Sequence, residues 1–341
     1  MGRAQLRTRD RCPVSARLVR CALSGLICAG FSAVAPTHAQ SSAVHMRAMV
    51  ALDGALEFAS VPMPVPQAGQ VRVRVSAASV NPVDWKLAAA APHGTPMIPG
   101  RDFCGRIDAL GPGVQGWRVG QAVIGVSASG AYAPYTLAAS GAIAQAPRSM
   151  SCIEAAGLPV AGESAWRSVV VVAEVRPGQR VLIHGGAGGV GTSTVQVAKA
   201  RGAYVIATAS ASHFALLREL GADQTLDYHR PDFDAGLANL DAVINAAEEA
   251  TGERSLRLLR PGGILVSLVG LPDPAHCRDA HVRCEAIGRV SGKYLEPLVA
   301  LVDAGRLRVP VERVLPLDQA AAAWEESRAH HVPGKVILRV Q

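Results

Sequence analysis

The chain has 341 residues, of which 49% are hydrophobic and 18% are charged. This balance excludes an intrinsically disordered protein, and the length is sufficient for two domains that each bury a core. The formal net charge of +7 does not predict a nucleic-acid partner or an anionic membrane, because most of the excess lies in the first 20 residues, where six arginines oppose one aspartate.

Residues 1–39 have the pattern of a secretory signal. An arginine-rich start is followed by an apolar segment over residues 22–35 and by a small-x-small cleavage site that ends at Ala39. The apolar segment is too short for a membrane-spanning helix. Two alternatives remain: a protein exported to the periplasm or secreted, or a cytoplasmic protein that starts at Met46, where a first strand begins.

Four of the seven cysteines lie beyond this leader. Cys277 and Cys284 flank a short segment that contains His276 and His281. A metal site and, after export, a disulfide are both conceivable here. The spacing matches no common zinc pattern, so neither is the leading interpretation.

The next part of the chain has the pattern of a small β-rich domain. Residues 71–75 alternate apolar and basic side chains, as a half-buried strand does. Further short strands are expected at residues 105–110, 122–126 and 135–138. Strands at this density, separated by glycine and proline turns, predict a compact β-barrel. Helical patterning then begins, over residues 153–156 and 164–174.

Residues 181–208 have the pattern of a strand, a glycine turn, a helix and a second strand. Gly186, Gly188 and Gly191 have the GxGxxG spacing, directly after the apolar run 181–183. In this motif the first glycine permits a tight turn, the second lets the backbone approach a pyrophosphate, and the third lets the helix pack against the strand. The pyrophosphate then lies at the positive end of the helix. The expected phosphate turn consists of Gly186, Ala187, Gly188, Gly189, Val190 and Gly191.

The second strand of this unit indicates which dinucleotide binds. NAD sites usually place an acid about twenty residues after the fingerprint, on the ribose 2′-hydroxyl. Residues 204–214 contain no acid, and Ser210 and His213 stand in its place, with Arg218 further on. We therefore expect NADP(H), with Ser210 and His213 near the 2′-phosphate. The alternative for His213 is a solvated residue in the first turn of the next helix.

The alternation of helix and strand continues to the C-terminus. Helices are expected at 213–220, 251–259, 293–304 and 318–328, and strands at 240–245, 264–269 and 335–340. This order predicts a doubly wound parallel sheet. Asn245 and Val269 end two of its strands, and they are therefore expected at the carboxyl edge, where ligands bind.

Seven motifs follow one another along the chain: NPVDWK (81–86), PGRDFCG (99–105), GAYAPYTLA (130–138), LPVAGESAW (158–166), HGGAGGVG (184–191), LRPGGILVSLVG (259–270) and GKVIL (334–338). In this order they resemble the zinc-independent medium-chain dehydrogenase/reductases, in the quinone oxidoreductase (zeta-crystallin-like) branch. The resemblance covers residues 46–341. It implies a GroES-like β-barrel domain over residues 46–160, completed by 305–341, and a Rossmann NADP-binding domain over 161–304.

The resemblance also implies a site without a metal. Zinc-dependent relatives have Gly-His-Glu where this chain has Gly100, Arg101 and Asp102, and a guanidinium is not a metal ligand. Quinones and enones need no strong Lewis acid, because their reduction places charge on a delocalised oxygen. We expect an enzyme that reduces quinones or the C=C bond of α,β-unsaturated carbonyls with NADPH. The alternatives are a non-catalytic NADPH-binding scaffold or sensor and a zinc alcohol dehydrogenase with other ligands.

Three residues are the catalytic candidates. Asn81 is expected to offer its amide to the substrate oxygen or the nicotinamide, or else to cap the turn before Pro82. Arg101 either supplies the positive charge that zinc supplies elsewhere or forms an ion pair with Asp102. Tyr132 either lines the acceptor pocket or packs in the core.

The remaining cofactor residues also follow from the resemblance. Ser164 stands where the family often has a threonine near the nicotinamide. Tyr228 resembles the tyrosine that lies against the adenosine in relatives. The expected partners are NADP(H), a small quinone or enone and a second copy of the chain in a homodimer.

Overall fold

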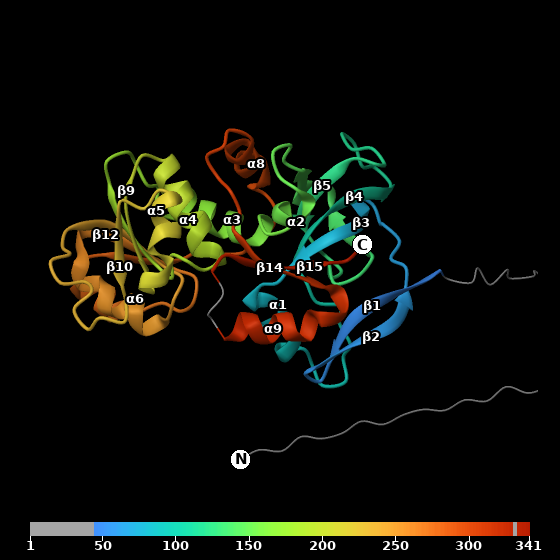
Figure 1. The fold of residues 1–341 in the computed structure, drawn as a ribbon, viewed down its shortest axis with the longest axis horizontal. Helices are drawn as coiled ribbons and strands as arrows, with labels where there is room; N and C mark the ends of the chain where they lie inside the picture. The colour runs from blue at the N-terminus through green and yellow to red at the C-terminus, as the bar shows by residue number, and fades with distance from the viewer. Residues whose placement is uncertain (1–43, 330–332) are drawn as a thin grey trace, which may run out of the picture. The chain divides into compact units, whose positions relative to one another are not determined.

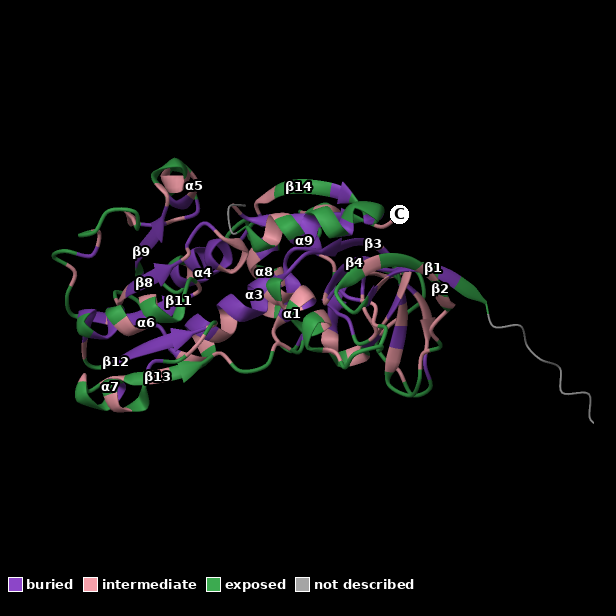
Figure 2. Cartoon of the chain, turned by 90° about the horizontal axis from the view of Figure 1, so that it is seen from below, coloured by how far each residue is buried: buried purple, intermediate pink, exposed green. Residues whose placement is uncertain are grey.

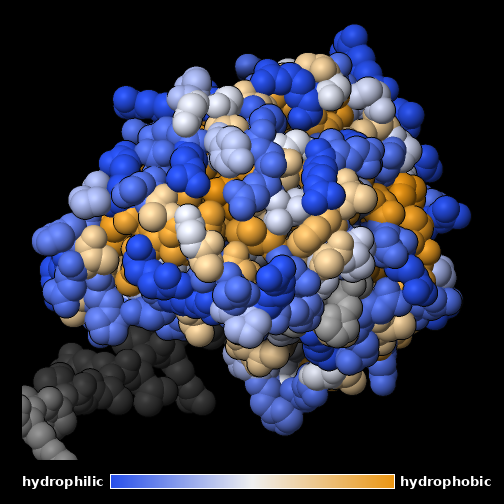
Figure 3. Space-filling view, turned by 60° about the vertical axis from the view of Figure 1, so that its left-hand side comes forward, coloured by the Kyte–Doolittle hydropathy of each residue, from blue (hydrophilic) through white to orange (hydrophobic). Residues whose placement is uncertain are grey.

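The computed structural model describes residues 44–329 and 333–341, so the predicted leader lies outside the described residues. Three sheets organise the described chain: a hairpin, a seven-stranded sheet and a six-stranded sheet. No helix in these two ranges has the length and apolar character needed to cross a membrane. Figure 3 shows one face on which hydrophilic side chains cover most of the surface and apolar ones gather in bands between them.

The hairpin consists of β1 (His45–Leu52) and β2 (Ala55–Pro62), which pair antiparallel. Asp53 and Gly54 form its turn, with φ angles of 48° and 86°. Two consecutive residues at positive φ are typical of the tight turn that joins twisted strands, and Asp-Gly is a favoured sequence for it. The sequence predicted a strand near Met46 but not its partner.

The seven-stranded sheet has the order β14 (Val311–Pro316), β15 (Lys335–Arg339), β3 (Gln70–Ser79), β4 (Asp102–Leu110), β5 (Ala122–Val126) and β7 (Ile143–Gln145), with β6 (Tyr135–Ala139) also paired to β3. Val71, Val73 and Val75 are fully buried, while Arg74 between them is exposed. This alternation is the one that the sequence predicted. Because β15 pairs with β3, the end of the chain completes the sheet that the N-terminal part begins.

Short helices accompany this sheet. Helix α1 (Pro82–Ala90) lies between β3 and β4, whereas α2 (Cys152–Ala155), α3 (Pro159–Trp166) and a π-helical segment at Arg167–Val172 lead from β7 to the rest of the chain. The helix predicted at 164–174 is therefore the end of α3 continued by wider turns. Ala173 N–H donates to Ser168 O, five residues earlier, which is the π-helical spacing.

The six-stranded sheet is parallel throughout, with the order β10 (Gln224–Asp227), β9 (Tyr204–Ala209), β8 (Arg180–His184), β11 (Leu240–Asn245), β12 (Leu259–Ser267) and β13 (Arg283–Ala286). This is the strand order of a Rossmann fold, so the predicted doubly wound sheet is confirmed. The helix predicted at 251–259 ends early: α6 (Glu249–Ser255) is followed by a 3-10 turn, and β12 begins at Leu259.

Alternate residues of these strands pack into two separate cores. Val181 and Ile183 pack in one core with α4 (Gly189–Ala200), α5 (Phe214–Glu219) and α8 (Leu295–Asp303), whereas Leu182 packs in the other core with α7 (Pro274–Asp279). Both faces of the sheet are thus covered, which is why its strands are continuously apolar. Figure 2 shows the buried strands β8 and β11 among helices that carry exposed residues on their outer faces. Helix α9 (Ala320–Arg328; Figure 1) packs on the seven-stranded sheet through Trp324.

Two disulfides join the four cysteines that follow the leader. Cys104 on β4 bonds to Cys152 at the start of α2, and Cys277 on α7 bonds to Cys284 on β13. For Cys277 and Cys284 the sequence favoured neither a disulfide nor a metal site, and the structure forms the disulfide. Within residues 44–329 and 333–341, no three His, Cys, Asp or Glu side chains are grouped to hold a metal ion.

Candidate active site

The glycine turn between β8 and α4 has one position that protein packing leaves open. A Cβ on Gly191 would lie 2.0 Å from the Gly185 carbonyl oxygen, and one on Gly186 would lie 3.0 Å from the Ala207 Cβ. A Cβ on Gly188 would meet nothing closer than 3.5 Å. Gly191 is therefore required by the fold itself, whereas the glycine at 188 keeps space free for a group outside the chain. Gly188 is also the N-cap of α4 and provides no capping side chain. The turn fits the pyrophosphate of a dinucleotide.

A cavity of about 890 Å³ lies at the carboxyl ends of the parallel strands. Six of the twelve predicted cofactor residues line it: Ala187, Gly188, Ser210, His213, Tyr228 and Val269. Gly186, Gly189, Val190 and Gly191 form the turn beside it without being part of its lining. Ser164 is 3% exposed on α3 and does not reach this cavity.

Asn245 acts on the same cavity through the backbone. It is fully buried, its Nδ2 donates to Glu248 O at 2.7 Å, and its Oδ1 accepts from Ala247 N at 3.1 Å. Both ends of the amide are thus used to shape the loop 246–248, whose residues line the cavity. Asn245 is a positioning residue in this geometry.

The end of β9 provides hydroxyl and imidazole groups. Ser210 Oγ donates to the Tyr228 hydroxyl at 3.2 Å and lies 3.1 Å from His229 Nε2, and the two rings are 4.2 Å apart. Arg218 donates to Thr225 Oγ1 and is not part of the cavity wall. Among the described lining residues Glu248 is the one acid, and it belongs to the loop after β11 rather than to the end of β9.

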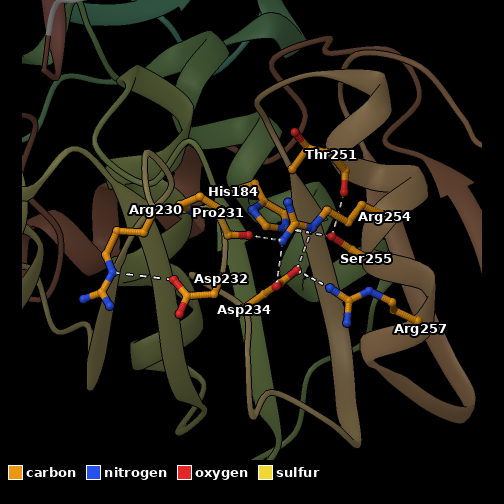
Figure 4. A network of polar contacts seen from close by, with 9 residues as sticks. All are labelled: His184, Arg230, Pro231, Asp232, Asp234, Thr251, Arg254, Ser255 and Arg257. Carbon is orange, nitrogen blue, oxygen red and sulfur yellow. Dashed lines mark hydrogen bonds and ion pairs between the residues drawn. The ribbon is translucent and has the colours of Figure 1, made fainter.

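His184, at the end of β8, is a lining residue that the sequence did not identify. Its Nδ1 lies 3.2 Å from Thr208 Oγ1. Its Nε2 lies 2.9 Å from Ser255 Oγ, as Figure 4 shows. Ser255 Oγ donates to Thr251 O, so it accepts from Nε2–H and leaves Nδ1 to accept from Thr208. Burial lowers the His184 pKa to about 4, which keeps the ring neutral at physiological pH.

An arginine pair lies beside His184 and supports the wall of this cavity. Arg254 binds both carboxylate oxygens of Asp234, at 2.9 and 2.8 Å, and Arg257 binds one of them at 2.7 Å (Figure 4). The Arg254 guanidinium also lies 4.9 Å from the ring centre of Phe233. Burial raises the Asp234 pKa, but the hydrogen bonds and charges of the two arginines outweigh it and lower the pKa below its ordinary value. Position at the carboxyl edge of the sheet was the signal for His184, whereas nothing local marked Arg254.

A second cavity, of about 720 Å³, adjoins the seven-stranded sheet. Its lining comes from the β1–β2 hairpin, from α1, and from the two segments 96–101 and 127–130. Asp84 and Arg101 are the titratable side chains among these described residues. This cavity contains one of the three catalytic candidates, Arg101.

Asn81 lies behind this cavity in a buried hydrogen-bond network. Its Oδ1 accepts from Lys335 Nζ at 2.6 Å, and its Nδ2 donates to Asp102 Oδ2 at 2.8 Å. Lys335 also donates to Val80 O, and Asp102 accepts from Val160 N. In this geometry the Asn81 Oδ1 and one of the two Nδ2 hydrogens bind Lys335 and Asp102, so the amide positions these groups.

Asp84 connects this network to the cavity. Its Oδ2 accepts from Asn81 N at 2.9 Å and from the Tyr132 hydroxyl at 3.2 Å, and its Oδ1 accepts from Arg101 N at 3.1 Å. Burial raises the pKa of Asp84 to about 7 and that of Asp102 to about 6. Burial also lowers the pKa of Lys335, against the attraction of both carboxylates.

The two other catalytic candidates, Tyr132 and Arg101, have different surroundings. Tyr132 is fully buried, its hydroxyl bonds Asp84 and accepts from Trp324 Nε1 at 3.3 Å, and it packs in the core rather than lining the acceptor cavity. Arg101 lines the cavity, and no ion pair joins it to Asp102. Its Nε is buried without a hydrogen-bond partner among the described residues. Neighbouring residues of an extended chain point to opposite faces, which separates the two side chains.

The C-terminal strand brings the glycine turn close to this second site. Gly334 N–H donates to Ala187 O at 2.8 Å, and a Cβ on Gly189 would lie 2.7 Å from Lys335 Cδ. Lys335 in turn binds Asn81, whose N–H binds Asp84. A few side chains in contact, from Lys335 through Asn81 to Asp84, therefore connect the glycine turn to the arginine-lined cavity. This arrangement suits hydride transfer between a dinucleotide held at the turn and a second molecule in the cavity.

Comparison with known proteins gives matches over most of the chain. Residues 67–174 match the family model of the alcohol dehydrogenase GroES-like domain, and residues 220–338 match that of the zinc-binding dehydrogenases. The quinone oxidoreductase structure from Coxiella burnetii has a TM-score of 0.79 at 31% identity, covering 87% of this chain and 100% of that one. A chloroplast envelope quinone oxidoreductase homolog from Arabidopsis thaliana is 29% identical, over 83% of this chain and 93% of the relative. A 2-methylene-furan-3-one reductase from Solanum lycopersicum is also 29% identical, over 82% of this chain and 74% of the relative.

Proposed function

The chain belongs to the medium-chain dehydrogenase/reductase family, in its quinone oxidoreductase-like branch, and from that premise we propose that it is an NADPH-dependent, zinc-independent reductase of quinones or of the C=C bond of α,β-unsaturated carbonyls. In this proposal residues 161–304 hold the nucleotide, and residues 46–160 with 305–341 hold the acceptor. The observation that carries it is the unpaired Arg101 in a cavity linked to the glycine turn.

The glycine turn would hold the pyrophosphate, and the groups at the end of β9 would hold the 2′-phosphate. Ser210, His213 and Tyr228 line the cavity there, and His229 lies against Ser210. An acid on the ribose would repel a 2′-phosphate, and the wall after β9 has none. Ser164 is kept as a residue near the nicotinamide only as a prediction from the resemblance, as is the homodimer.

Bound NADPH supplies the hydride in this reaction. The chain stabilises the negative charge that then develops on the acceptor oxygen, and the Arg101 guanidinium is the group suited to this, because it is charged at every relevant pH. Asp84 accepts from the Arg101 backbone N–H and so holds that backbone in place. Asn81 donates to both Asp84 and Asp102, and Lys335 donates to Asn81. Arg101 thus stands where a zinc ligand stands in zinc-dependent relatives, and it provides charge without a metal.

Steady-state reduction tests the proposal. Purified protein is mixed with NADPH or NADH and with 1,4-naphthoquinone, an enone or a saturated ketone, and the loss of the reduced nicotinamide is followed by absorbance. We expect activity with NADPH on the quinone or the enone, unchanged after treatment with a metal chelator. Arg101→Gln is expected to lower kcat/KM, whereas Arg74→Gln, on the exposed side of β3, is the matched control.

Two results would point to the alternatives. NADPH binding without turnover of any acceptor would favour a scaffold or sensor. Stoichiometric zinc in the purified protein, with activity lost on chelation, would favour a zinc alcohol dehydrogenase.

The two disulfides support a proposal on location as well. Disulfides persist in oxidising compartments and are rare where thiols are kept reduced. Because Cys104, Cys152, Cys277 and Cys284 are all paired, we favour export after cleavage of the leader over a cytoplasmic protein that starts at Met46. N-terminal sequencing of the native protein tests this: a start just after Ala39 supports export, and a start at Met46 contradicts it.

A further inference from the structure

The arginine-lined cavity has an excess of positive charge. Arg101 is charged at all relevant pH values, and Asp84 is the one acid among the described lining residues. Asp84 is 1% exposed, and its two oxygens accept three hydrogen bonds from the protein. Burial raises its pKa to about 7, so near neutral pH a large fraction of it is uncharged. Asp102, which acts electrostatically on Arg101 and on Lys335, lies behind the cavity and is not part of its lining. An anion that enters the cavity therefore meets the full positive charge of Arg101 and at most a partial negative charge on the lining acid.

The Arg101 guanidinium is left without a partner. Among the described residues it forms no side-chain hydrogen bond or ion pair, although its Nε is shielded from solvent. A buried polar group without a partner is costly, and the cost is recovered when a ligand supplies the acceptor. The guanidinium presents its donors as a planar fork, which fits two oxygens held side by side.

Of the other polar side chains that line the cavity, Ser60 lies exposed on β2, whereas Ser127 and Ser129 are bonded within the protein. Ser127 Oγ bonds Thr136 Oγ1 at 2.7 Å and accepts from Ser129 N. Ser129 Oγ accepts from Leu137 N at 2.8 Å. These hydroxyls form a bonded chain and leave Arg101 as the ligand for an anion.

The rest of the lining is largely apolar. It includes Val50, Val61, Leu87, Met97 and Ile98. The cavity thus fits a molecule with an apolar body, such as an aromatic ring, and one anionic edge. Its volume of about 720 Å³ is within the range of sites for small organic ligands.

We propose that the acceptor has an anionic oxygen on the carbon next to its reducible carbonyl, as in an ionised 2-hydroxy-1,4-quinone or an unsaturated 2-oxo carboxylate, and that Arg101 binds both oxygens. This inference rests on the proposed function and specifies its substrate class. The planar guanidinium then binds the anionic oxygen of the acceptor before the reaction. It also binds the carbonyl oxygen on which negative charge develops during hydride transfer. For the quinone, hydride from the nicotinamide and one proton from water give the hydroquinone, and Arg101 keeps its own protons.

Binding to the protein without nucleotide tests this directly. Ionised 2-hydroxy-1,4-naphthoquinone and neutral 2-methoxy-1,4-naphthoquinone are a matched pair, because they differ chiefly in charge at one position. Calorimetric titration of the wild-type chain is expected to give a dissociation constant at least about tenfold lower for the anion, the size of a charge-assisted hydrogen bond. Arg101→Gln is expected to abolish the difference, Arg101→Lys to keep part of it, and Arg74→Gln to keep all of it.

Equal binding of the two quinones by the wild-type chain, or a preference that survives in Arg101→Gln, would overturn the inference. If Arg101→Gln does not fold, the wild-type pair and Arg101→Lys still decide it. Steady-state kinetics then separate the two proposals. A chain that binds the anion tightly but reduces neither a quinone nor an enone contradicts the proposed function alone, whereas one that reduces both quinones with equal KM contradicts the anionic substrate class alone.

Discussion

Two buried carboxylate clusters in this chain have opposite electrostatics. At the arginine-lined cavity, Asp84 and Asp102 both interact with the Lys335 ammonium, Asp102 also feels the charge of Arg101, and their hydrogen-bond donors are neutral groups. Beside the nucleotide cavity, Asp234 alone receives Arg254 and Arg257. Burial raises the pKa of Asp84 to about 7, whereas the arginines lower the pKa of Asp234.

The number of cations and the repulsion between Asp84 and Asp102 account for the difference. Burial penalises the charged form in both places, but two guanidinium groups outweigh that penalty and one shared ammonium does not. Asp234 is therefore a permanent anion that anchors a wall of the nucleotide cavity. Asp84 and Asp102 titrate near neutral pH, next to the cavity that we assign to the acceptor.

Removal of Lys335 has the largest expected effect, because Lys335 is the cation that acts on both buried carboxylates. Lys335→Met is expected to lower the free energy of unfolding by about 3–5 kcal/mol, the order of the cost when a buried charge loses its compensating charge. Urea unfolding at pH 8 measures it. Lys86→Met, at an exposed position on α1, is the control and is expected to change little.

A double variant sharpens this prediction. In Lys335→Met combined with Asp102→Asn the lost cation no longer leaves Asp102 charged, so the double variant is expected to be more stable than Lys335→Met alone. Equal stability of the single and double variants would mean that packing of the lysine chain, and not its charge, explains the loss.

Removal of Arg254 is expected to have a smaller effect, because Arg257 remains on Asp234. Arg254→Met leaves one of the two cations and is expected to cost about 2–3 kcal/mol, the order of a hydrogen bond between charged groups. Because it also removes the contact with Phe233 at the cavity wall, the dissociation constant for NADPH is expected to rise. Arg230→Met, whose ion pair with Asp232 is exposed, is the matched control. An Arg254→Met chain as stable as that control would contradict the anchoring role.

The sequence predicted the parts of this comparison that depend on local pattern. Strand periodicity identified β3, and glycine spacing located the turn before α4, because each signal lies within a few residues. The bonds of Lys335 to Asn81 and of Arg254 to Asp234 join distant segments, so no local pattern marked them. Short edge strands such as β10 and β13 carried too few residues for a periodic signal.

Adjacency in sequence also misled. The neighbouring positions of Arg101 and Asp102 made an ion pair one of the predicted alternatives. The extended backbone points the two side chains to opposite faces, and Asp102 bonds Asn81 instead. For Tyr132 and Asn81, no local pattern marked the hydrogen bonds that their polar groups form inside the protein, because the partners are distant in sequence.

The pH dependence of stability is the finest test of the contrast. Because the folded-state pKa of Asp84 is raised from 3.8 to about 7, its contribution to stability is fully present below pH 4 and is lost as pH rises towards 7. Between pH 5 and pH 6 this loss is at most about 1.4 kcal/mol. Asp84→Asn also breaks a hydrogen bond at every pH, so its absolute stability falls, but its stability is expected to decline less steeply with pH than that of the wild type.

Asp232→Asn, an exposed control, is expected to keep the wild-type slope. Urea unfolding at several pH values measures the slopes, and parallel curves for wild type and Asp84→Asn would mean that the carboxyl at 84 ionises normally despite its burial.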